Sequence, residues 1–313
     1  KTSLRILVTG GAGFIGSHLR EILVNRGYNI TVLDSLIFGH MQNLNTVKEK
    51  SNFNFIKGDC RNPQDVHKAL ENVETVFHFA ASSDICLDIA DPKKCYEQNI
   101  LSTYTLLEEV RKSKLVKDIV FASTSAVYGD AKVVPTPESY APLKPISVYG
   151  ATKLACEALF SSYCGSFGLR GAIFRLANVV GPRCSHGVVH DFIKKLETNT
   201  SSLEILGDGT QSKSYLHIDD CVGAIIKAYE FGGDCIEIFN VGADDQVSVA
   251  EIAKIVVKEL GLDGVEFRLT GGVDGGRGWI GDVKNMLLET SRIKSLGWKP
   301  KLSSRDAIKL TVR

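Results

Sequence analysis

The feature that most restricts the fold of this chain lies at its start, where an apolar run leads into a cluster of glycines. Residues 5–9 have the β-branched, apolar character of a buried strand, and the turn after them contains Gly10, Gly13 and Gly16. Apolar residues then recur on one helical face until Gly27. Glycines let a backbone approach a phosphate, and a helix N-terminus offers amide donors. The order therefore predicts a pyrophosphate-binding loop, with a simple tight turn as the alternative.

Aspartates at the ends of the next two strands point to the ligand. Asp34 follows the second strand-like run, residues 30–33. A carboxylate at this place accepts the ribose hydroxyls of NAD and repels the 2′-phosphate of NADP, so we expect NAD as the cofactor. Asp59 ends the third run, residues 53–57, and either reaches the adenine or only forms a turn.

Strand and helix patterns alternate along the first half of the chain. Further strand-like runs occupy residues 75–79, 119–122 and 172–176, and helical patterns occupy residues 91–112 and the stretch from residue 149. Such alternation requires crossover connections. The predicted fold class is therefore α/β, a doubly wound parallel sheet with helices on both faces.

The alternation loosens after residue 178, where we place a domain boundary. We assign residues 1–178 to an NAD-binding domain, to which residues 215–243 return. Residues 179–214 and 244–313 form a smaller α/β substrate-binding domain. In the latter, Ser248 and Glu251 predict a helix with a capping box, and the glycine-rich stretch 270–281 predicts a functional surface loop.

The composition excludes several classes of protein. The formal net charge of +1 argues against a nucleic-acid-binding protein, which needs a basic surface. No run of about 18 uncharged apolar residues exists to form a transmembrane helix. The eight cysteines include no Cys-x-x-Cys pair and are typical of reduced thiols, and glycines interrupt the only candidate for a secretory signal. We therefore expect a cytoplasmic protein with no membrane or nucleic-acid partner.

A tyrosine and a lysine one helical turn apart are the strongest catalytic candidates. The pattern Tyr-x-x-x-Lys begins at Tyr128, Tyr140 and Tyr149, but glycine or proline interrupts the first two. Only Tyr149 leads into a helical pattern, which places Lys153 on the same face. The ammonium group favours the phenolate and lowers the phenol pKa from its usual value of about 10. Tyr149 can then take a hydroxyl proton near neutral pH.

Hydroxyl groups follow the fifth strand-like run directly, in Ser123, Thr124 and Ser125. In α/β sheets, ligands bind at the carboxyl ends of the strands. Thr124 can hydrogen-bond the reacting oxygen there and pass its proton to Tyr149. The alternative is an ordinary turn rich in hydroxyl groups.

These residues lie within longer motifs that together resemble one family. The motifs are TGGAGFIGSHL at 9–19, VLDSL at 32–36, KGDCRN at 57–62, VFHFAA at 76–81, STSAVYG at 123–129, VYGATK at 148–153, FRLANVVGPR at 174–183 and ILGDGTQSKSYLHIDD at 205–220. Over nearly its whole length the chain resembles the extended short-chain dehydrogenase/reductases, and among them the NAD-dependent sugar-nucleotide epimerases. The segments HGVV at 186–189 and GRGWIGD at 276–282 are most similar to archaeal-type UDP-galactose (UDP-glucose) 4-epimerases.

The resemblance implies a Rossmann fold and a UDP-hexose 4-epimerase that interconverts UDP-glucose and UDP-galactose. Tyr149, assisted by Lys153 and Thr124, would deprotonate the sugar 4-hydroxyl, with a transient 4-keto sugar and enzyme-bound NADH. An alternative is another NAD-dependent sugar-nucleotide enzyme: a UDP-uronate or UDP-N-acetylhexosamine 4-epimerase, a decarboxylase or a reductase. A remote alternative is a non-catalytic dinucleotide-sensing module, which would need none of these three residues.

The resemblance also implies which residues contact the ligands. The cofactor-binding residues are Gly10, Gly13, Phe14, Ile15, Gly16, Asp34, Asp59, Ala80, Asn99, Tyr149 and Lys153. The residues that bind the UDP-sugar are Ser125, Asn178, Arg183, Val188, Lys213, Arg277 and Met286.

Three of the substrate residues carry specific expectations. The planar fork of Arg277 suits a clamp on phosphates, with a solvated loop arginine as the alternative. Lys213 stands where relatives often carry arginine, so it keeps the charge and loses the bidentate geometry. Met286 is flexible and smaller than tyrosine, so we expect room for an N-acetyl group on the sugar C2.

Several other readings are disfavoured. Related 4,6-dehydratases carry Asp and Glu after the position of Thr124, whereas this chain has Ser125 and Ala126, so we do not expect dehydration. We expect no metal site, because His186 and His190 lack a third ligand. We interpret His78, in a buried strand-like run, as a core histidine whose hydrogen bonds are satisfied.

Cys86 and Cys95 flank the substrate side of the predicted sheet, with nothing nearby to lower a thiol pKa. The helical faces 101–110 and 154–163 belong either to the core or to a surface for partner helices, and by analogy with the family they would form a four-helix bundle in a homodimer.

Overall fold

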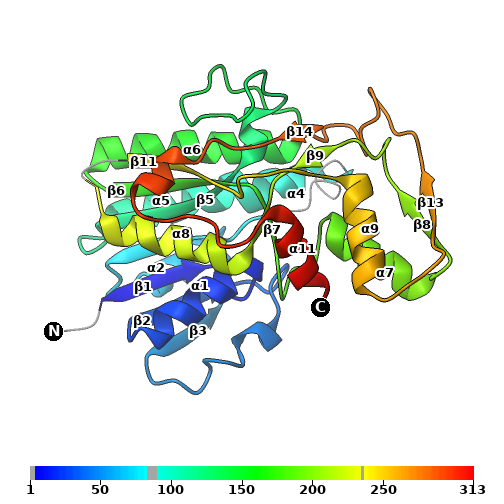
Figure 1. The fold of residues 1–313 in the computed structure, drawn as a ribbon. Coiled ribbons are helices and arrows are strands. Elements are labelled where there is room, and N and C mark those ends of the chain that lie inside the picture. Colours follow the sequence, from blue (N-terminus) through cyan, green and yellow to red (C-terminus); the bar gives the residue numbers. More distant parts are fainter. Residues whose placement is uncertain (1–3, 83–89, 234–235) are drawn as a thin grey trace. The chain divides into compact units, whose positions relative to one another are not determined.

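The computed structural model describes residues 4–82, 90–233 and 236–313 (Figure 1). A seven-stranded sheet has the order β11-β6-β5-β4-β1-β2-β3. The strands are β1 (Arg5–Thr9), β2 (Asn29–Asp34), β3 (Phe53–Lys57), β4 (Thr75–His78), β5 (Asp118–Thr124), β6 (Arg170–Leu176) and β11 (Ile236–Val241). The pairs β3–β2, β2–β1, β1–β4 and β4–β5 are parallel, and the strand order reverses between β1 and β4. The predicted doubly wound α/β sheet is confirmed.

Helices connect these strands as crossovers. They are α1 (Phe14–Asn25), α2 (Pro63–Ala69), α4 (Pro92–Tyr96), α5 (Ser102–Lys112), α6 (Val148–Phe167) and α8 (Ile218–Phe231), with 3₁₀ turns η1 (Met41–Leu44) and η3 (Ser125–Tyr128). The helix predicted over residues 91–112 contains a π-helical turn, η2 (Glu97–Leu101), between α4 and α5. This turn includes Asn99, whose side chain is buried. Insertions of this kind are frequent at functional sites.

Helices cover both faces of the sheet. On one face, α2, α5 and α6 pack their apolar side chains against alternate residues of the strands, such as Leu7, Val76 and Phe121. On the other face lies α1 (Figure 1). There Phe77 also packs edge-on against Tyr229, near the end of α8, with ring centroids 5.0 Å apart. This burial on both faces explains why the strands read as continuous apolar runs.

The second half of the chain adds short strands and helices around a core of their own. The elements are β7 (Asn178–Val180), α7 (Val188–Thr198), β8 (Ser202–Ile205), β9 (Ser212–Lys213), β10 (Tyr215–His217), β12 (Val247–Ser248), α9 (Val249–Glu259), β13 (Glu266–Leu269), β14 (Asn285–Met286), α10 (Ser291–Ser295) and α11 (Ser304–Val312). Helices α7, α9 and α11 share one apolar core with β8, at the right of Figure 1. The capping box predicted for Ser248 and Glu251 is present at the start of α9.

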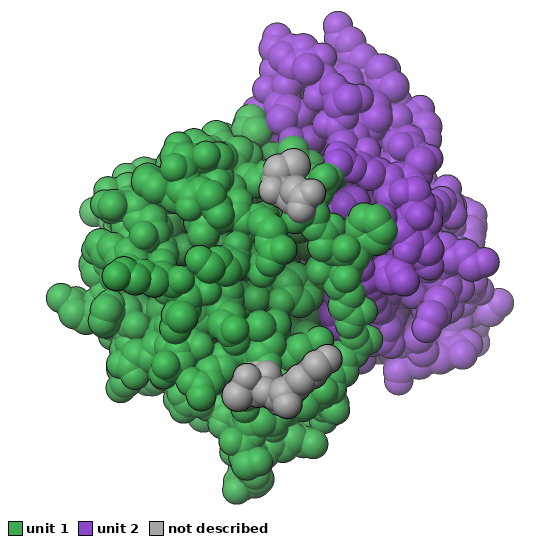
Figure 2. All heavy atoms as spheres, turned by 90° about the vertical axis from the view of Figure 1, so that its left-hand side faces the viewer, with its two compact units in different colours: residues 1–123, 151–174, 228–238 green, residues 124–150, 175–227, 239–313 purple. Residues whose placement is uncertain are grey.

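The chain divides into two compact units, coloured separately in Figure 2. Unit 1 comprises residues 1–123, 151–174 and 228–238, and unit 2 comprises residues 124–150, 175–227 and 239–313. The division into domains at residue 178 stays a prediction. Among the residues that the structure describes, none of the helices has both the length and the apolar character that a membrane span requires.

Candidate functional site

The turn between β1 and α1 has room for backbone and none for side chains. Gly10 adopts a φ of +69°, and a Cβ on it would lie 2.6 Å from the amide nitrogen of Ala80. A Cβ on Gly16 would lie 2.3 Å from the carbonyl oxygen of Gly10. Gly13 is the N-cap of α1 and provides no side-chain acceptor for the amides of the first turn. Those amides suit an anion such as the pyrophosphate of a dinucleotide, which fits the predicted cofactor.

Asp34 ends β2 beside this turn, with only 7% of its surface exposed. Its Oδ2 accepts a hydrogen bond from the amide of Ala12 at 2.9 Å, and its Oδ1 accepts one from the amide of Leu36 at 2.8 Å. Burial raises the pKa of this carboxyl above its usual value, although the two backbone bonds and nearby His40 oppose that shift. A carboxylate has about four acceptor positions, so Asp34 keeps capacity for the hydroxyls of a ribose.

The predicted cofactor residue Asp59 has a partner that its place in the sequence does not reveal. Arg61 donates to both carboxylate oxygens of Asp59, from Nη2 to Oδ2 at 2.7 Å and from Nε to Oδ1 at 3.1 Å. Partial burial acts to raise the Asp59 pKa, but the bonds from Arg61 outweigh it, so the pKa lies below its usual value. Asp59 is therefore ionised, with Arg61 beside it.

Asn99 and Ala80 lie within the same unit as the glycine turn. The side-chain oxygen of Asn99 accepts from the amide of Ser82 at 2.8 Å, and its nitrogen donates to the hydroxyl of Thr152 in α6 at 2.9 Å. Thr9 holds the amide of Ala80 at 3.2 Å. Asn99 thus joins the segment after β4 to the helix that carries Lys153.

Lys153 is a buried cation on α6, one turn after Tyr149. Its side chain is 96% removed from solvent, and its Nζ lies 4.3 Å from the centroid of the Phe121 ring. Burial lowers the pKa of Lys153 to about 8, against the opposing influence of Cys156, Glu157 and Cys95. An ammonium group beside a phenol lowers the phenol's pKa most strongly where water is excluded.

Glu157, which is not among the predicted site residues, lies one further turn along α6. It is buried and accepts a hydrogen bond from the hydroxyl of Ser123 at 2.5 Å. Tyr149, Lys153 and Glu157 follow at intervals of four residues, so they share one helical face. That spacing was the one signal in the sequence for Glu157.

The turn that carries Thr124 packs against the turn that carries Tyr149. Thr124 is the last residue of β5, and its hydroxyl accepts from the amide of Ala126 at 3.1 Å. A Cβ on Gly150 would lie 2.8 Å from the carbonyl oxygen of Ala126, so only glycine fits after Tyr149 without displacing the backbone. Within unit 2, the structure thus brings these two predicted catalytic residues to adjoining turns.

The two predicted phosphate-binding cations are both paired with carboxylates in unit 2. Nη1 and Nη2 of Arg277 donate to the two carboxylate oxygens of Asp130 at 3.1 and 2.9 Å. Lys213 donates to Oδ1 of Asp282 at 2.6 Å, and its Nζ lies 5.7 Å from the ring of Trp279. Nothing in the sequence pattern identified Asp130 or Asp282, because each lies far along the chain from its partner.

The remaining predicted substrate residues occupy separate elements of unit 2. Asn178 begins β7 beside Tyr215 of β10, and Met286 pairs with Lys213 between β14 and β9. Val188 opens α7, partly buried against the unit's core, and Arg183 adopts a φ of +68°. Ser125 opens η3. Their roles stay predictions.

Other sequence-based expectations concern histidines and cysteines. His78 is buried, and its ring nitrogens hydrogen-bond the hydroxyls of Thr9 and Thr103 at 2.7 and 2.9 Å, as expected of a satisfied core residue. Among the described residues, no cluster of histidine, cysteine and carboxylate side chains could hold a metal ion. Cys86 and Cys235 lie outside the described residues.

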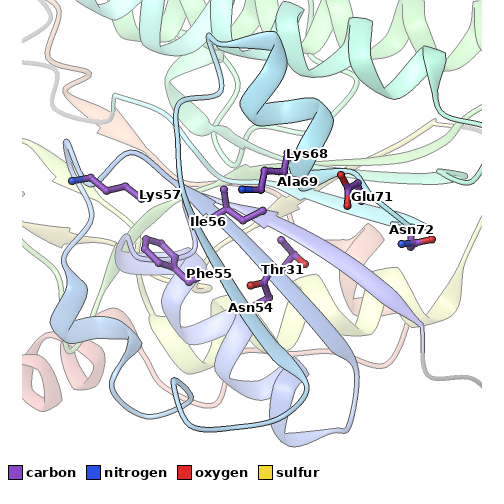
Figure 3. Close-up of a pocket in the computed structure, with 9 residues that line it drawn as sticks. All are labelled: Thr31, Asn54, Phe55, Ile56, Lys57, Lys68, Ala69, Glu71 and Asn72. Carbon is purple, nitrogen blue, oxygen red and sulfur yellow. The ribbon is translucent and has the colours of Figure 1, made fainter.

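A hollow of about 380 Å³ lies over β2, β3 and α2 (Figure 3). Thr31, Asn54 and Ile56 face it from the strands, and Lys68 lies at its edge on α2. None of the predicted site residues lines this hollow.

The chain is similar to known proteins along nearly its whole length. The model of the NAD dependent epimerase/dehydratase family matches residues 6–242. The chain is 34% identical over 312 residues to a putative UDP-glucose 4-epimerase of Methanocaldococcus jannaschii. This alignment covers 98% of this chain and 97% of that protein. The crystal structure of a UDP-galactose 4-epimerase aligns with a TM-score of 0.86 at 41% identity, over 99% of this chain and 97% of the other.

A further solved structure is UDP-glucuronic acid 4-epimerase from Bacillus cereus, in complex with UDP-glucuronic acid and NAD. It aligns with a TM-score of 0.89 at 31% identity, over 99% of this chain and 98% of the other.

Proposed function

The chain belongs to the NAD dependent epimerase/dehydratase family, and from that membership we propose that it is a UDP-hexose 4-epimerase that interconverts UDP-glucose and UDP-galactose. The observation that carries this proposal is the face of α6, where Tyr149 precedes a buried lysine by one turn. Similarity to proteins named UDP-glucose and UDP-galactose 4-epimerases along nearly the whole chain supports the choice of substrate.

The proposed mechanism assigns proton transfer to Tyr149. Its phenolate takes the proton of the sugar 4-hydroxyl. It returns this proton after the 4-keto sugar has rotated to present its other face. The ammonium group of Lys153 stabilises the negative charge of the phenolate, and Thr124 hydrogen-bonds the reacting oxygen and orients it. Bound NAD would supply the hydride acceptor at the sugar C4 and, in its reduced form, the hydride donor, so the net reaction would not be redox. Gly10, Gly13, Gly16 and the carboxylate of Asp34 hold the cofactor.

Epimerisation fits the residues after Thr124 better than dehydration does. Ser125 and Ala126 form the turn η3 there, and neither side chain can act as an acid and base at neutral pH. Elimination of water across C5 and C6 needs such groups. The turn therefore supports an enzyme that acts at C4 alone.

We propose that Arg277 and Lys213 bind the diphosphate of the UDP group. Asp130 occupies both Nη atoms of Arg277 and is half-exposed, so it is the group that a diphosphate would displace from the arginine. Asp282 is buried against Lys213 and remains as its anchor. Asp130 thereby holds the guanidinium of Arg277, in the loop 270–281, in position before the substrate arrives.

Incubating the purified enzyme with a panel of UDP-sugars, without added NAD, tests the substrate. We expect UDP-glucose and UDP-galactose to interconvert, and UDP-N-acetylglucosamine to react as well, because Met286 leaves room at C2. Nucleotide-sugar chromatography measures the products. Turnover of UDP-glucuronic acid with none of UDP-glucose would overturn the proposal in favour of a uronate epimerase. Turnover of UDP-glucose without detectable turnover of UDP-N-acetylglucosamine would contradict only the role of Met286.

We further propose a homodimer that joins α5 and α6 of two copies in a four-helix bundle. Tyr104 and Phe167 are exposed by 47% and 49%, which is high for aromatic side chains on neighbouring helices. The rings of Phe167 and Tyr163 lie 5.3 Å apart, and Arg111 lies over Phe167 at 5.7 Å. This aromatic surface resembles the composition of protein interfaces, which are enriched in tyrosine, phenylalanine and arginine.

Charge on the aromatic surface should separate the dimer. We expect the double variant Tyr104→Glu, Phe167→Glu to elute as a monomer when light scattering follows size-exclusion chromatography, because two buried carboxylates per subunit would be desolvated. Phe231→Glu is the control, since Phe231 is 68% exposed and lies outside α5 and α6. A dimer that survives the double substitution would place the interface elsewhere.

We also propose that the enzyme acts in the cytoplasm. The support is that Cys60, Cys95, Cys156, Cys164, Cys184 and Cys221, the cysteines within the described part of the chain, are free thiols. A reducing compartment keeps thiols in that state.

A further inference from the structure

Arg20 is a charged residue in the interior of unit 1. It lies in α1, six residues after the first residue of the helix, and none of its surface is exposed. It is one of the largest fully buried side chains in the described part of the chain, and the others of similar size are apolar. Burying a guanidinium removes its hydration and destabilises the fold unless hydrogen bonds replace the water.

The contacts of Arg20 join the glycine turn to a segment that follows Asp34. Its Nε donates to the carbonyl oxygen of Gly11 at 3.4 Å, and its Nη2 donates to the carbonyl oxygen of Asn43 in η1. Its Nη1 donates to the hydroxyl of Thr46 at 3.4 Å. The guanidinium also lies over the ring of Phe53, 5.7 Å from its centroid. One side chain thus spans two loops that are separate in sequence.

A second set of bonds ties the same two loops together around Ala12. The carbonyl oxygen of Ala12 accepts from the amide of His40 at 3.0 Å and from the side-chain nitrogen of Asn43 at 2.8 Å. The amide of Ala12 donates to Asp34, the carboxylate expected to bind the ribose. The glycine turn, Asp34 and residues 40–46 therefore form one connected cluster, and Arg20 lies beneath it.

We propose that Arg20 is a positioning residue of the cofactor site, which holds the glycine turn and residues 40–46 in the arrangement that receives the pyrophosphate and adenosine of NAD. Fixing the carbonyl oxygen of Gly11 on the inner side of the turn holds the start of α1, whose first-turn amides suit an anion. The buried positive charge adds to the α1 dipole in a region of low dielectric. Preorganisation of this kind strengthens binding because fewer groups must be ordered when the ligand arrives.

Stability alone does not account for an arginine at this position. An apolar residue of similar volume in place of a buried ion is often neutral or stabilising for the fold. Leu19 and Leu23 of the same helix show that α1 packs with ordinary apolar residues. The role of Arg20 in NAD binding is independent of which sugar the enzyme converts.

Exchange of bound NAD tests the proposal on the purified holoenzyme. Isotopically labelled NAD is added, and its incorporation into Arg20→Met and wild-type enzyme is followed after rapid gel filtration. We expect bound NAD to be released about tenfold faster from the variant, which is the scale of losing about 1.4 kcal/mol of binding free energy. Amides of residues 10–16 and 40–46 should exchange hydrogen faster in the same variant.

Leu19→Ala is the matched control, because Leu19 is equally buried and adjacent in α1. It should lower the melting temperature through a core cavity and leave the NAD release rate within twofold of wild type. Wild-type NAD release from Arg20→Met would overturn the proposal and leave Arg20 a purely structural residue. If Arg20→Met does not fold, Arg20→Lys decides on the same criterion, since it keeps the charge and loses the fork that bridges the two loops.

Discussion

Replacing Tyr149 with phenylalanine is expected to lower kcat about a thousandfold while leaving bound NAD in place. The substitution removes only the phenolic oxygen, which is the proposed base, and positioned proton transfer contributes about 10²–10⁴-fold to catalysis. The aromatic ring remains, so the first turn of α6 keeps its packing against the turn of Thr124. The measurements are the rate of UDP-galactose formation from UDP-glucose and the NAD content of the purified variant.

The chain supplies a matched control in another Tyr-x-x-x-Lys pattern. Tyr140 accepts a hydrogen bond from the amide of Lys132 at 3.1 Å and lies outside the helices, so Tyr140→Phe should retain activity within about twofold. A Tyr149→Phe enzyme with full turnover would refute the assignment of the base. Loss of bound NAD from the variant would instead assign Tyr149 a role in holding the cofactor.

Replacing Lys153 with methionine is expected to change activity and stability in opposite directions. We expect kcat to fall by about 10²–10³, because the phenol of Tyr149 would lose the charge that lowers its pKa. The free energy of unfolding at pH 7 should rise by about 1–3 kcal/mol, since burial of the ammonium group lowers its pKa to about 8 and that penalty disappears. Urea unfolding and the epimerase assay measure the two effects.

The pH dependence of the free energy of unfolding shows whether burial of the Lys153 charge causes the stability gain in Lys153→Met. Between about pH 8 and the usual lysine pKa near 10.5, the unfolded wild-type chain binds a proton at Lys153 that the folded chain does not. Wild-type stability should therefore rise through this window as the burial penalty is relieved, and Lys153→Met should lack that rise. Lys144→Met, at an exposed lysine, is the control for loss of charge alone. Equal pH profiles for wild type and Lys153→Met would contradict a buried charged lysine.

Local features of the fold follow from sequence patterns. The run of residues 5–9 is the strand β1, the run 53–57 is β3, and Ser248 and Glu251 form the predicted capping box of α9. The control among the Tyr-x-x-x-Lys patterns also holds, since only Tyr149 lies in an α-helix. These features depend on side-chain periodicity, glycine conformation and capping, which act between residues close in the chain.

Features that depend on side-chain rotamer, burial or partners far along the chain did not follow from the sequence. The π-helical turn around Asn99 appeared in the sequence as an uninterrupted helix. Arg61 lies two residues from Asp59 in the same motif, yet its bidentate bond depends on rotamer and burial. Asp130, which holds Arg277, lies 147 residues from it, and no periodicity records such a pair.

By itself, the sequence determined the order of strands and helices, the glycine turn, the acidic residue at the end of β2 and the spacing of Tyr149 and Lys153. Each of these features depends on residues that are close in sequence, because steric limits on the backbone and the pitch of a helix are local. Only the tertiary structure decided which charges are buried and what they touch. Arg20 beneath the glycine turn and Lys153 over Phe121 are examples, because desolvation and Coulomb energies depend on distances in space that the order of residues does not contain.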